Sequence, residues 1–459
     1  MQGILGILVF CGIAWVVSEK RGTINWRVLF GGLVMQFTLA IVLIKFPPIA
    51  AKIALLNEVV QALDKATMAG TSFIFGYLGG GQLPFENITG NPGSTFILAF
   101  RALPLVMVVS ALTSLLFYWK VLPYIVRGFA FILRKSLGIG GAEGLGSAAN
   151  IFVGMVEAPL FIKPYMNRLN RSELFVIMTA GMATIAGTMM VIYAYTIAPL
   201  FEGEYALETA GPGALGHLLI ASLLSAPASI VIARLMIPET DAMQRTDGQI
   251  SDPHPAKNSM DAVTHGTMEG LKLWLNIIAM LIVLVALVAL VNMFLGWLHN
   301  LVGASPESEW SLQAILGWIM QIFVWLMGVP WSEASTAGEW MGTKIILNEF
   351  LAYLDMVPYV TGEVANVQTQ IQTLRDAGEA IPMALTMRLE SLERTSLIMS
   401  YAICGFANFG SLGIMLGGLG TMAPERRGEI AGLGMKSILA GNLATMLTGS
   451  VVGLIYYWF

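Results

Sequence analysis

Two isolated glutamates are the residues in this chain that are best suited to bind a polar ligand. Glu157 is the only charged residue between Glu143 and Lys163, in the apolar stretch SAANIFVGMVEAPLFIKPY. Glu349 has similar surroundings in the sequence ILNEFLAY. At the centre of a membrane-spanning helix a charged side chain costs about 2.5–3.5 kcal/mol, so it usually serves a ligand or an ion pathway. The structural alternative is that each carboxylate pairs with neighbouring donors or with a lysine such as Lys163 or Lys344.

Composition indicates that these apolar surroundings are a membrane. The chain has 459 residues, of which 56% are hydrophobic and only 12% charged, against about 25% charged in soluble domains. A net charge of -4 gives no basic footprint for nucleic acid. The histidines lack metal-site spacing, both cysteines fall in predicted spans, and no HExxH or paired-aspartate motif indicates an enzyme. We therefore expect a non-enzymatic integral membrane protein without a cofactor.

Eight segments are apolar enough to be read as membrane spans, which need about 20 residues each. The first is short, but the bases Lys20 and Arg21 follow its apolar run, opposite to a cleavable signal peptide, so we expect a retained anchor. The predicted spans are Gly3 to Val17, Trp26 to Lys45, Phe96 to Trp119, Leu174 to Tyr195, His217 to Met236, Leu271 to Leu298, Leu397 to Met422 and Gly432 to Trp458.

The distribution of charge predicts the orientation of these spans. Lysines and arginines gather after the first and third spans and before the fourth and eighth, and short cytoplasmic loops retain such residues. The segments 201–216 and 300–310 contain acids but no lysine or arginine, so they should face outward. With eight spans, both termini then lie outside the cytoplasm, in a multi-pass protein of the cell's inner (plasma) membrane.

The second half of the chain repeats the order of the first. An amphipathic stretch at 121–138 and its counterpart at 311–328, both expected to be interfacial helices, each precede a segment that contains one of the two glutamates, a broken span and one further span. We interpret the segments 139–168 and 330–356 as re-entrant helical hairpins, because neither forms one clean span. Non-helical backbone at this depth requires a protein or water-filled environment. The first copy begins at the cytoplasm and the second outside, so the repeats are inverted, as in alternating-access transporters.

The expected fold is therefore all-α, with eight transmembrane helices and two hairpins. The second repeat also contains a polar insert of helix-forming composition at 357–393, which we expect to be solvated. In chain order the expected parts are scaffold spans one to three with an outer amphipathic segment (1–120), the first repeat (121–237), a polar linker (238–262), scaffold span six (263–300) and the second repeat (301–459).

Several long motifs resemble those of the concentrative nucleoside transporter family. They run from GGGQLPFENITGNPGSTF (79–96) through ANIFVGMVEAPL and TKIILNEFLAYLDM to CGFANFGSLGIMLGGLGTMAPERRGEIA, and so cover most of the chain. The resemblance implies a cation–nucleoside symporter whose transport domain moves like an elevator against a homotrimeric scaffold in membrane lipid. Sodium is the implied coupling ion, with protons as the alternative. The other alternative is an elevator-type carrier for another small polar solute, such as an amino acid or a dicarboxylate. It predicts cationic residues near the tips, and 147–162 and 395–425 contain none.

The resemblance also implies which residues bind the substrate. Glu349, Asn408 and Ser411 match the residues that bind the ribose hydroxyls in the family, while Phe406 and Met189 would pack against the ligand. On periodicity alone, Phe406 would instead be a core residue. A carboxylate suits a vicinal diol because charge-assisted hydrogen bonds are strong. The alternative for Asn408 is a polar contact between helices.

The first hairpin tip departs from the family pattern. Many members have Gly-Gln-Thr-Glu where this chain has Gly154-Met155-Val156-Glu157. The resemblance places Met155, Val156 and Glu157 near the base, but methionine and valine cannot form the same hydrogen bonds, and selectivity depends on such bonds. The preferred nucleobase is therefore left open.

The family's sodium ion lies between the first hairpin tip and the break in the fourth span. The matching ligands are the side chains of Asn150 and Thr184 and the carbonyl oxygens of Val153 and Ile185. Unwound backbone provides such ligands in transporters. The alternative for the Thr184 hydroxyl is a hydrogen bond back to its own helix.

Overall fold

The computed structural model describes residues 2–85, 96–201, 212–239, 256–302 and 310–458, and within these ranges helices are its only regular elements. This agrees with the predicted all-α fold. Residues 86–95 of the first family motif, most of the two segments predicted to face outward, and residues 240–255 of the linker lie outside the described residues.

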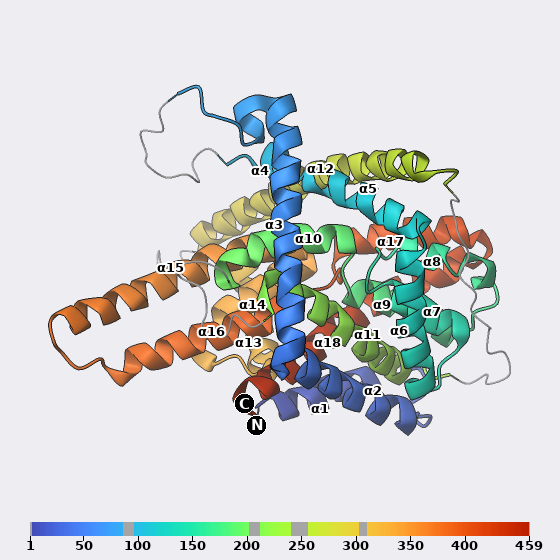
Figure 1. Cartoon of the computed structure of the whole chain (residues 1–459). Helices are drawn as coiled ribbons and strands as arrows, with labels where there is room; N and C mark the ends of the chain where they lie inside the picture. Colours follow the sequence, from blue (N-terminus) through green and yellow to red (C-terminus); the bar gives the residue numbers. More distant parts are fainter. Residues whose placement is uncertain (1, 86–95, 202–211, 240–255, 303–309, 459) are drawn as a thin grey trace.

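The first three helices differ from the prediction in one respect. Helices α1 (Gln2–Val16) and α2 (Trp26–Ala40) match the first two spans, and a π-helical turn, Ile41–Lys45, completes the second. The expected outer amphipathic segment is one continuous helix of 29 residues, α3 (Pro47–Phe75), which a proline can start because its missing N–H has no helical partner there. Figure 1 shows α3 running crosswise to α10 and α12.

Helices α5 and α12 pack closely along each other. A short helix, α4 (Leu98–Arg101), leads into α5 (Leu105–Tyr118), which α6 (Val121–Leu137) follows. Helix α12 (Ser259–Val302) has 44 residues, so the end of the predicted linker is helical. A Cβ at Gly266 would lie 2.6 Å from the Ser110 carbonyl oxygen, so glycine permits this close approach. Much of the rest of α12 is exposed and apolar.

The first repeat contains the predicted hairpin and broken span. Helices α7 (Gly141–Ala149) and α8 (Glu157–Leu160) are separated by the non-helical residues 150–156. Helix α9 (Arg171–Ala183) ends at Thr184, whose backbone is extended, and α10 (Gly187–Phe201) continues the span after the break. Helix α11 (Gly213–Met236) closes the repeat and is almost entirely buried.

The second repeat has the same order of elements. Helix α13 (Leu312–Met327) is bent by 117° from α14 (Trp331–Ile346), the first arm of hairpin 2, and α15 (Glu349–Asp376) is the second arm. Helices α16 (Met383–Ile403) and α17 (Phe409–Met422) form the second broken span, and α18 (Arg427–Trp458) ends the chain. The polar insert is the distal part of α15 and the start of α16, which project together from the bundle in Figure 1.

The helices support a protein that crosses the membrane several times. Among the described residues, six helices are long and apolar enough to span a bilayer, or seven if the bent α13–α14 pair counts as one. Helix α1 is shorter, and the predicted seventh span is divided between α16 and α17. The number of eight spans therefore stays a prediction.

Helix α18 is central to the packing, and both α1 and α2 contact it. Gln36 Nε2 on α2 donates a hydrogen bond to Thr448 Oγ1 over 3.0 Å, and a Cβ at Gly3 of α1 would lie 2.7 Å from Leu454 Cγ. The two helices expected to belong to a fixed scaffold are thus packed against the last helix of the second repeat. That α1 and α2 stay fixed while the transport domain moves remains a prediction.

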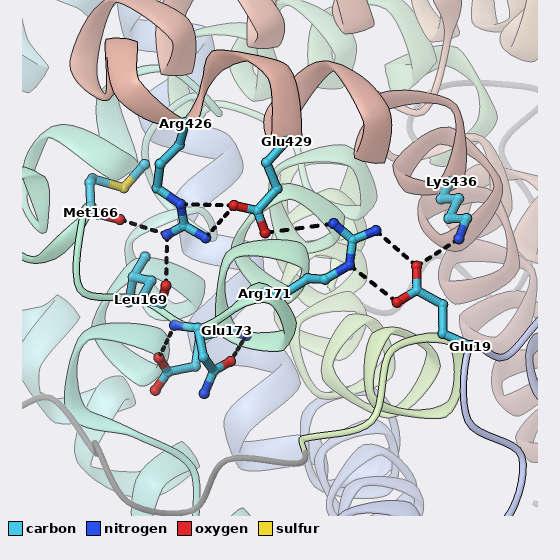
Figure 2. A network of polar contacts seen from close by, with 9 residues as sticks. Glu19, Met166, Leu169, Arg171, Glu173, Arg426, Glu429 and Lys436 are labelled. Atoms are coloured by element: carbon cyan, nitrogen blue, oxygen red, sulfur yellow. Dashed lines mark hydrogen bonds and ion pairs between the residues drawn. The ribbon is translucent and has the colours of Figure 1, made fainter.

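Ion pairs connect several elements at the rim where the sequence predicts the cytoplasm (Figure 2). Arg171, at the start of α9, donates to Glu19 Oε1 over 2.9 Å, and Lys436 of α18 donates to the same oxygen over 2.8 Å. Arg426 donates to Glu429 Oε2 over 2.8 Å and also to two backbone carbonyls that follow α8. The network joins the α1–α2 loop to both repeats.

Candidate functional site

The breaks in the two broken spans lie against each other in the interior. The Phe406 N–H donates to the Thr184 carbonyl over 3.3 Å, and the Gly187 N–H donates to the Phe152 carbonyl over 3.1 Å. Gly405 has a φ of 153°, and a Cβ there would lie 2.9 Å from a backbone oxygen at the end of α9. A glycine is therefore required for this approach. The two breaks and the tip of hairpin 1 are in direct contact.

The carboxylate of Glu349 is the centre of a buried hydrogen-bond cluster at this crossing. The residue is only 3% exposed. The Tyr193 hydroxyl donates to its Oε1, and Asn408 Nδ2 donates to its Oε2 over 2.8 Å. Glu349 is the first residue of α15, where the free N–H groups of a helix favour a negative charge. Asn348 caps this helix by accepting from the Leu351 N–H over 2.9 Å.

Asn408 is held in one orientation by a second contact. It is the N-cap of α17, and its Oδ1 accepts from the Ser411 N–H over 2.7 Å. Because Oδ1 is fixed by this contact, the Nδ2 amino group of Asn408 is directed toward Glu349. Phe406, Met189 and Ser411 are each 8% exposed. A fixed carboxylate beside a fixed amide offers acceptors and donors side by side, which suits a ligand with two adjacent hydroxyls.

Sequence reasoning predicted the proximity of Glu349 and Asn408 but missed Tyr193. Tyr193 is 156 residues from Glu349 in the sequence, and the only available signal was a polar hydroxyl within an apolar span. The lysine alternative for Glu349 is not realised, because Lys344 Nζ donates to the Ala402 carbonyl and to Thr445 Oγ1 instead.

The tip of hairpin 1 is arranged differently. Glu157 is exposed, and its carboxylate folds back so that a Cβ at Gly154 would lie 2.1 Å from Oε2. Met155 packs against α9, where a Cβ at Gly181 would lie 2.9 Å from its Cβ, and Val156 packs against α17. Within the described ranges no hydrogen bond joins Glu157 to the Glu349 cluster. The placement of Glu157 near the base of a nucleoside whose ribose is bound by Glu349 therefore stays a prediction.

Asn150 presents a buried oxygen without a hydrogen-bond partner. The residue is 1% exposed, its Nδ2 donates to the Gly146 carbonyl over 3.1 Å, and its Oδ1 has no hydrogen-bond partner among the described residues. That oxygen lies 3.5 Å from the position of a Cβ at Gly181, in the last turn of α9. The Thr184 hydroxyl donates back to the Ala180 carbonyl over 2.8 Å, as in the local alternative, but its lone pairs remain able to bind a cation.

These residues fit a sodium ion. A buried oxygen is normally paired, so Asn150 Oδ1 calls for a donor or a cation. The predicted partners, the Thr184 hydroxyl and the carbonyls of Val153 and Ile185, also offer only oxygen, and both apolar residues are buried. Carbonyls at helix breaks hold sodium in transporters. The described residues contain no cluster of three or more His, Cys, Asp or Glu side chains that could hold another metal.

Two hairpins that pack against two broken spans, with a buried carboxylate at the crossing, define a secondary transporter. Family models match most of the chain: "Na+ dependent nucleoside transporter N-terminus" at residues 5–78, "Nucleoside recognition" at 99–200 and "Na+ dependent nucleoside transporter C-terminus" at 217–453. The chain belongs to the concentrative nucleoside transporter family. Its relatives are permeases rather than enzymes.

Individual relatives align over nearly the whole chain. The uncharacterized transporter YutK of Bacillus subtilis is 36% identical, covering 99% of each chain, and the nucleoside permease NupC of Helicobacter pylori is 31% identical, covering 98% of this chain and 96% of the permease. The sodium/nucleoside cotransporter 1 of Rattus norvegicus is 30% identical over 98% of this chain and 63% of the rat protein.

Solved structures confirm the fold. CNTnw in an inward-facing substrate-bound state superimposes with a TM-score of 0.81 at 31% identity, covering 99% of this chain and 97% of that chain. A doubly substituted form of CNTnw in an outward-facing state gives a TM-score of 0.82. The fold of this chain is therefore one for which both states of alternating access have been solved.

Proposed function

We propose that this protein takes up nucleosides by symport with a cation, and that the cation is sodium. The hydrogen-bonded pair of Glu349 and Asn408 carries the proposal, because it offers a carboxylate and an amide to the two hydroxyls of a ribose. Tyr193 holds the carboxylate from its other side. When substrate binds, the ribose hydroxyls replace or add to these internal donors. Phe406, Ser411 and Met189 line the same site.

Sodium coupling is supported by the unpartnered oxygen of Asn150 beside the break at Thr184. A bound cation would pair with that oxygen and hold the hairpin 1 tip against α9 and α10. Nucleoside could then bind to a preformed site, which makes the two binding events cooperative. One coupled charge that crosses a potential of 100 mV contributes about 2.3 kcal/mol, or roughly fifty-fold accumulation at about 1.4 kcal/mol per decade.

Movement of the site across the membrane completes the proposal. The two hairpins serve as gates while the transport domain slides within a homotrimer in the inner membrane, with both termini outside the cytoplasm. The exposed apolar surface of α12 suits contacts with lipid and with a second copy of the chain. At the hairpin 1 tip, Met155 and Val156 are packed against helices, so Glu157 is left as the polar group nearest to a base.

Uptake by purified protein in proteoliposomes tests the function directly. We expect labelled nucleoside to accumulate when an inward sodium gradient is imposed, and competition by a nucleoside panel to identify the preferred base. If a separately imposed proton gradient drives uptake in the absence of sodium, the coupling ion is the proton rather than sodium. Accumulation of a different polar solute, with no competition by any nucleoside, would overturn it.

A further inference from the structure

Lys344 is a buried basic residue that the proposed transport site does not use. It lies in the last turn of α14 and is 0% exposed. Its Nζ donates to the Ala402 carbonyl over 3.2 Å and to Thr445 Oγ1 over 2.9 Å. Among the described residues it forms no direct ion pair, although it interacts electrostatically with the nearby carboxylate of Glu349, whose oxygens are hydrogen-bonded by a tyrosine and an asparagine. Oxygen atoms of a backbone carbonyl and a hydroxyl are thus its partners.

The ammonium of Lys344 lies at the C-terminal end of α16 in the second repeat. Ala402 lies in the last turn of α16, which ends at Ile403 where the break begins. The last carbonyls of a helix lack helical partners and carry partial negative charge. The ammonium of Lys344 therefore connects the first arm of hairpin 2 to the negative end of a half-helix, directly beside a break.

The first repeat has the same arrangement without the ammonium. Helix α7 is the first arm of hairpin 1, as α14 is of hairpin 2, and α9 ends at a break as α16 does. At the end of α7, Asn150 points an unpartnered oxygen toward the last turn of α9. One repeat thus has an oxygen that lacks a positive partner, and the other repeat contains a positive group of its own.

We propose that the ammonium of Lys344 is a tethered cation that takes, in the second repeat, the place that sodium takes in the first. The inference rests on the proposed sodium site at Asn150. Ammonium and sodium both carry one positive charge and both bind hydroxyl and carbonyl oxygens. Hairpin 2 is therefore held to α16 and α18 without an ion from solution, and one nucleoside requires one sodium ion. Removal of the amine leaves a second position that a dissolved cation must fill.

The number of sodium ions bound with each nucleoside tests this inference. Nucleoside affinity of the purified full-length protein is measured by calorimetry over a range of sodium concentrations at constant ionic strength. By linkage, the slope of log affinity against log sodium concentration counts these ions. We expect a slope of about one for the wild type and about two for Lys344→Ala, with affinity lowered about tenfold and restored by high sodium or by methylammonium. The control Lys272→Ala, at an exposed lysine of α12, should match the wild type.

Three outcomes would overturn the inference. The first is wild-type slope and affinity in Lys344→Ala. The second is a folded Lys344→Ala protein whose lost affinity neither sodium nor methylammonium restores. If the alanine variant fails to fold, Lys344→Met is used instead, because methionine fills the space without the charge. Wild-type nucleoside affinity in Lys344→Met is the third outcome that would overturn the inference. Failure of the proposed function is distinguishable, because the wild-type protein itself would then either bind no nucleoside or bind it with no dependence on sodium.

Discussion

The two hairpin tips differ in how completely the chain satisfies their polar groups. At hairpin 2, both oxygens of Glu349 are hydrogen-bonded and Lys344 bonds two acceptors. At hairpin 1, Glu157 is exposed, and the buried side-chain oxygen of Asn150 has no hydrogen-bond partner within the part of the chain that the structure describes. The polar groups of the second tip are therefore satisfied within the protein, whereas those of the first remain available to groups from solution. This difference predicts that substrate anchoring depends on hairpin 2 and ion dependence on hairpin 1.

The largest effect should come from breaking the hairpin 2 cluster. Glu349→Gln removes two charge-assisted hydrogen bonds to the ribose, each worth about 1.5–3 kcal/mol, so nucleoside uptake should fall about a hundredfold or more. Uptake in proteoliposomes measures this, with Glu379→Gln, at an exposed glutamate in the polar insert, as the control. Transport at the wild-type rate by Glu349→Gln would remove the ribose assignment.

A change at hairpin 1 should act on the ion rather than on the nucleoside. Asn150→Ala deletes the unpartnered oxygen, so the sodium concentration for half-maximal uptake should rise about tenfold, which corresponds to about 1.4 kcal/mol. At saturating sodium, the nucleoside affinity should return toward the wild-type value. Asn366→Ala, at an exposed position of α15, is the matched control. If the sodium response is unchanged, the ion is a proton or binds elsewhere.

A smaller change sharpens the view that hairpin 2 is preorganised. Tyr193→Phe removes one donor to Glu349 while the carboxylate remains, so nucleoside affinity should fall about threefold to tenfold with no change in sodium dependence. Tyr353→Phe is a stringent control, since its buried hydroxyl bonds the Ser400 carbonyl over 2.8 Å and leaves the carboxylate untouched. Equal losses in the two variants would mean that general stability is responsible.

The smallest effect is expected in the ion-pair network at the rim, which includes neither Glu157 nor Glu349. Arg171, as a hydrogen-bond donor, lowers the pKa of Glu19 to about 2 from an ordinary 4.5, with Lys436 adding to the effect. The lowered pKa stabilises the folded state above pH 4.5, and this contribution is lost as the pH falls toward 2. Because the pair is partly exposed, Glu19→Gln should cost only about 0.5–1 kcal/mol at neutral pH.

Unfolding of wild type and Glu19→Gln in detergent, followed at neutral and acidic pH, measures this contribution. The difference between the two proteins should shrink as the pH approaches 2, while nucleoside affinity at neutral pH stays at the wild-type value. Glu425→Gln, at an exposed glutamate nearby, provides the control. A loss of nucleoside affinity in Glu19→Gln would mean that the rim and the tips are coupled.

The sequence alone determined the helical membrane fold, both hairpins and both breaks. Apolar runs, glycines and prolines are local signals, and the backbone responds to them locally, so the interrupted segments at 139–168 and 330–356 were predictable, whereas the position of the break at Thr184 came from the family resemblance. The proximity of Glu349 and Asn408 came from the family resemblance. The length of α3 was missed because its apolar residues are mixed with polar ones.

Only the tertiary structure decided which groups satisfy the buried side chains. Tyr193 reaches Glu349 from 156 residues away, and Lys344 bonds Thr445 across 101 residues. Such partners depend on how the two repeats cross, and no periodicity encodes that crossing. In the same packing Glu157 is exposed, whereas the side-chain oxygen of Asn150 is buried with no hydrogen-bond partner among the described residues, although the sequence around both residues is apolar. Burial and pairing are properties of the whole bundle, because each requires atoms that distant segments supply.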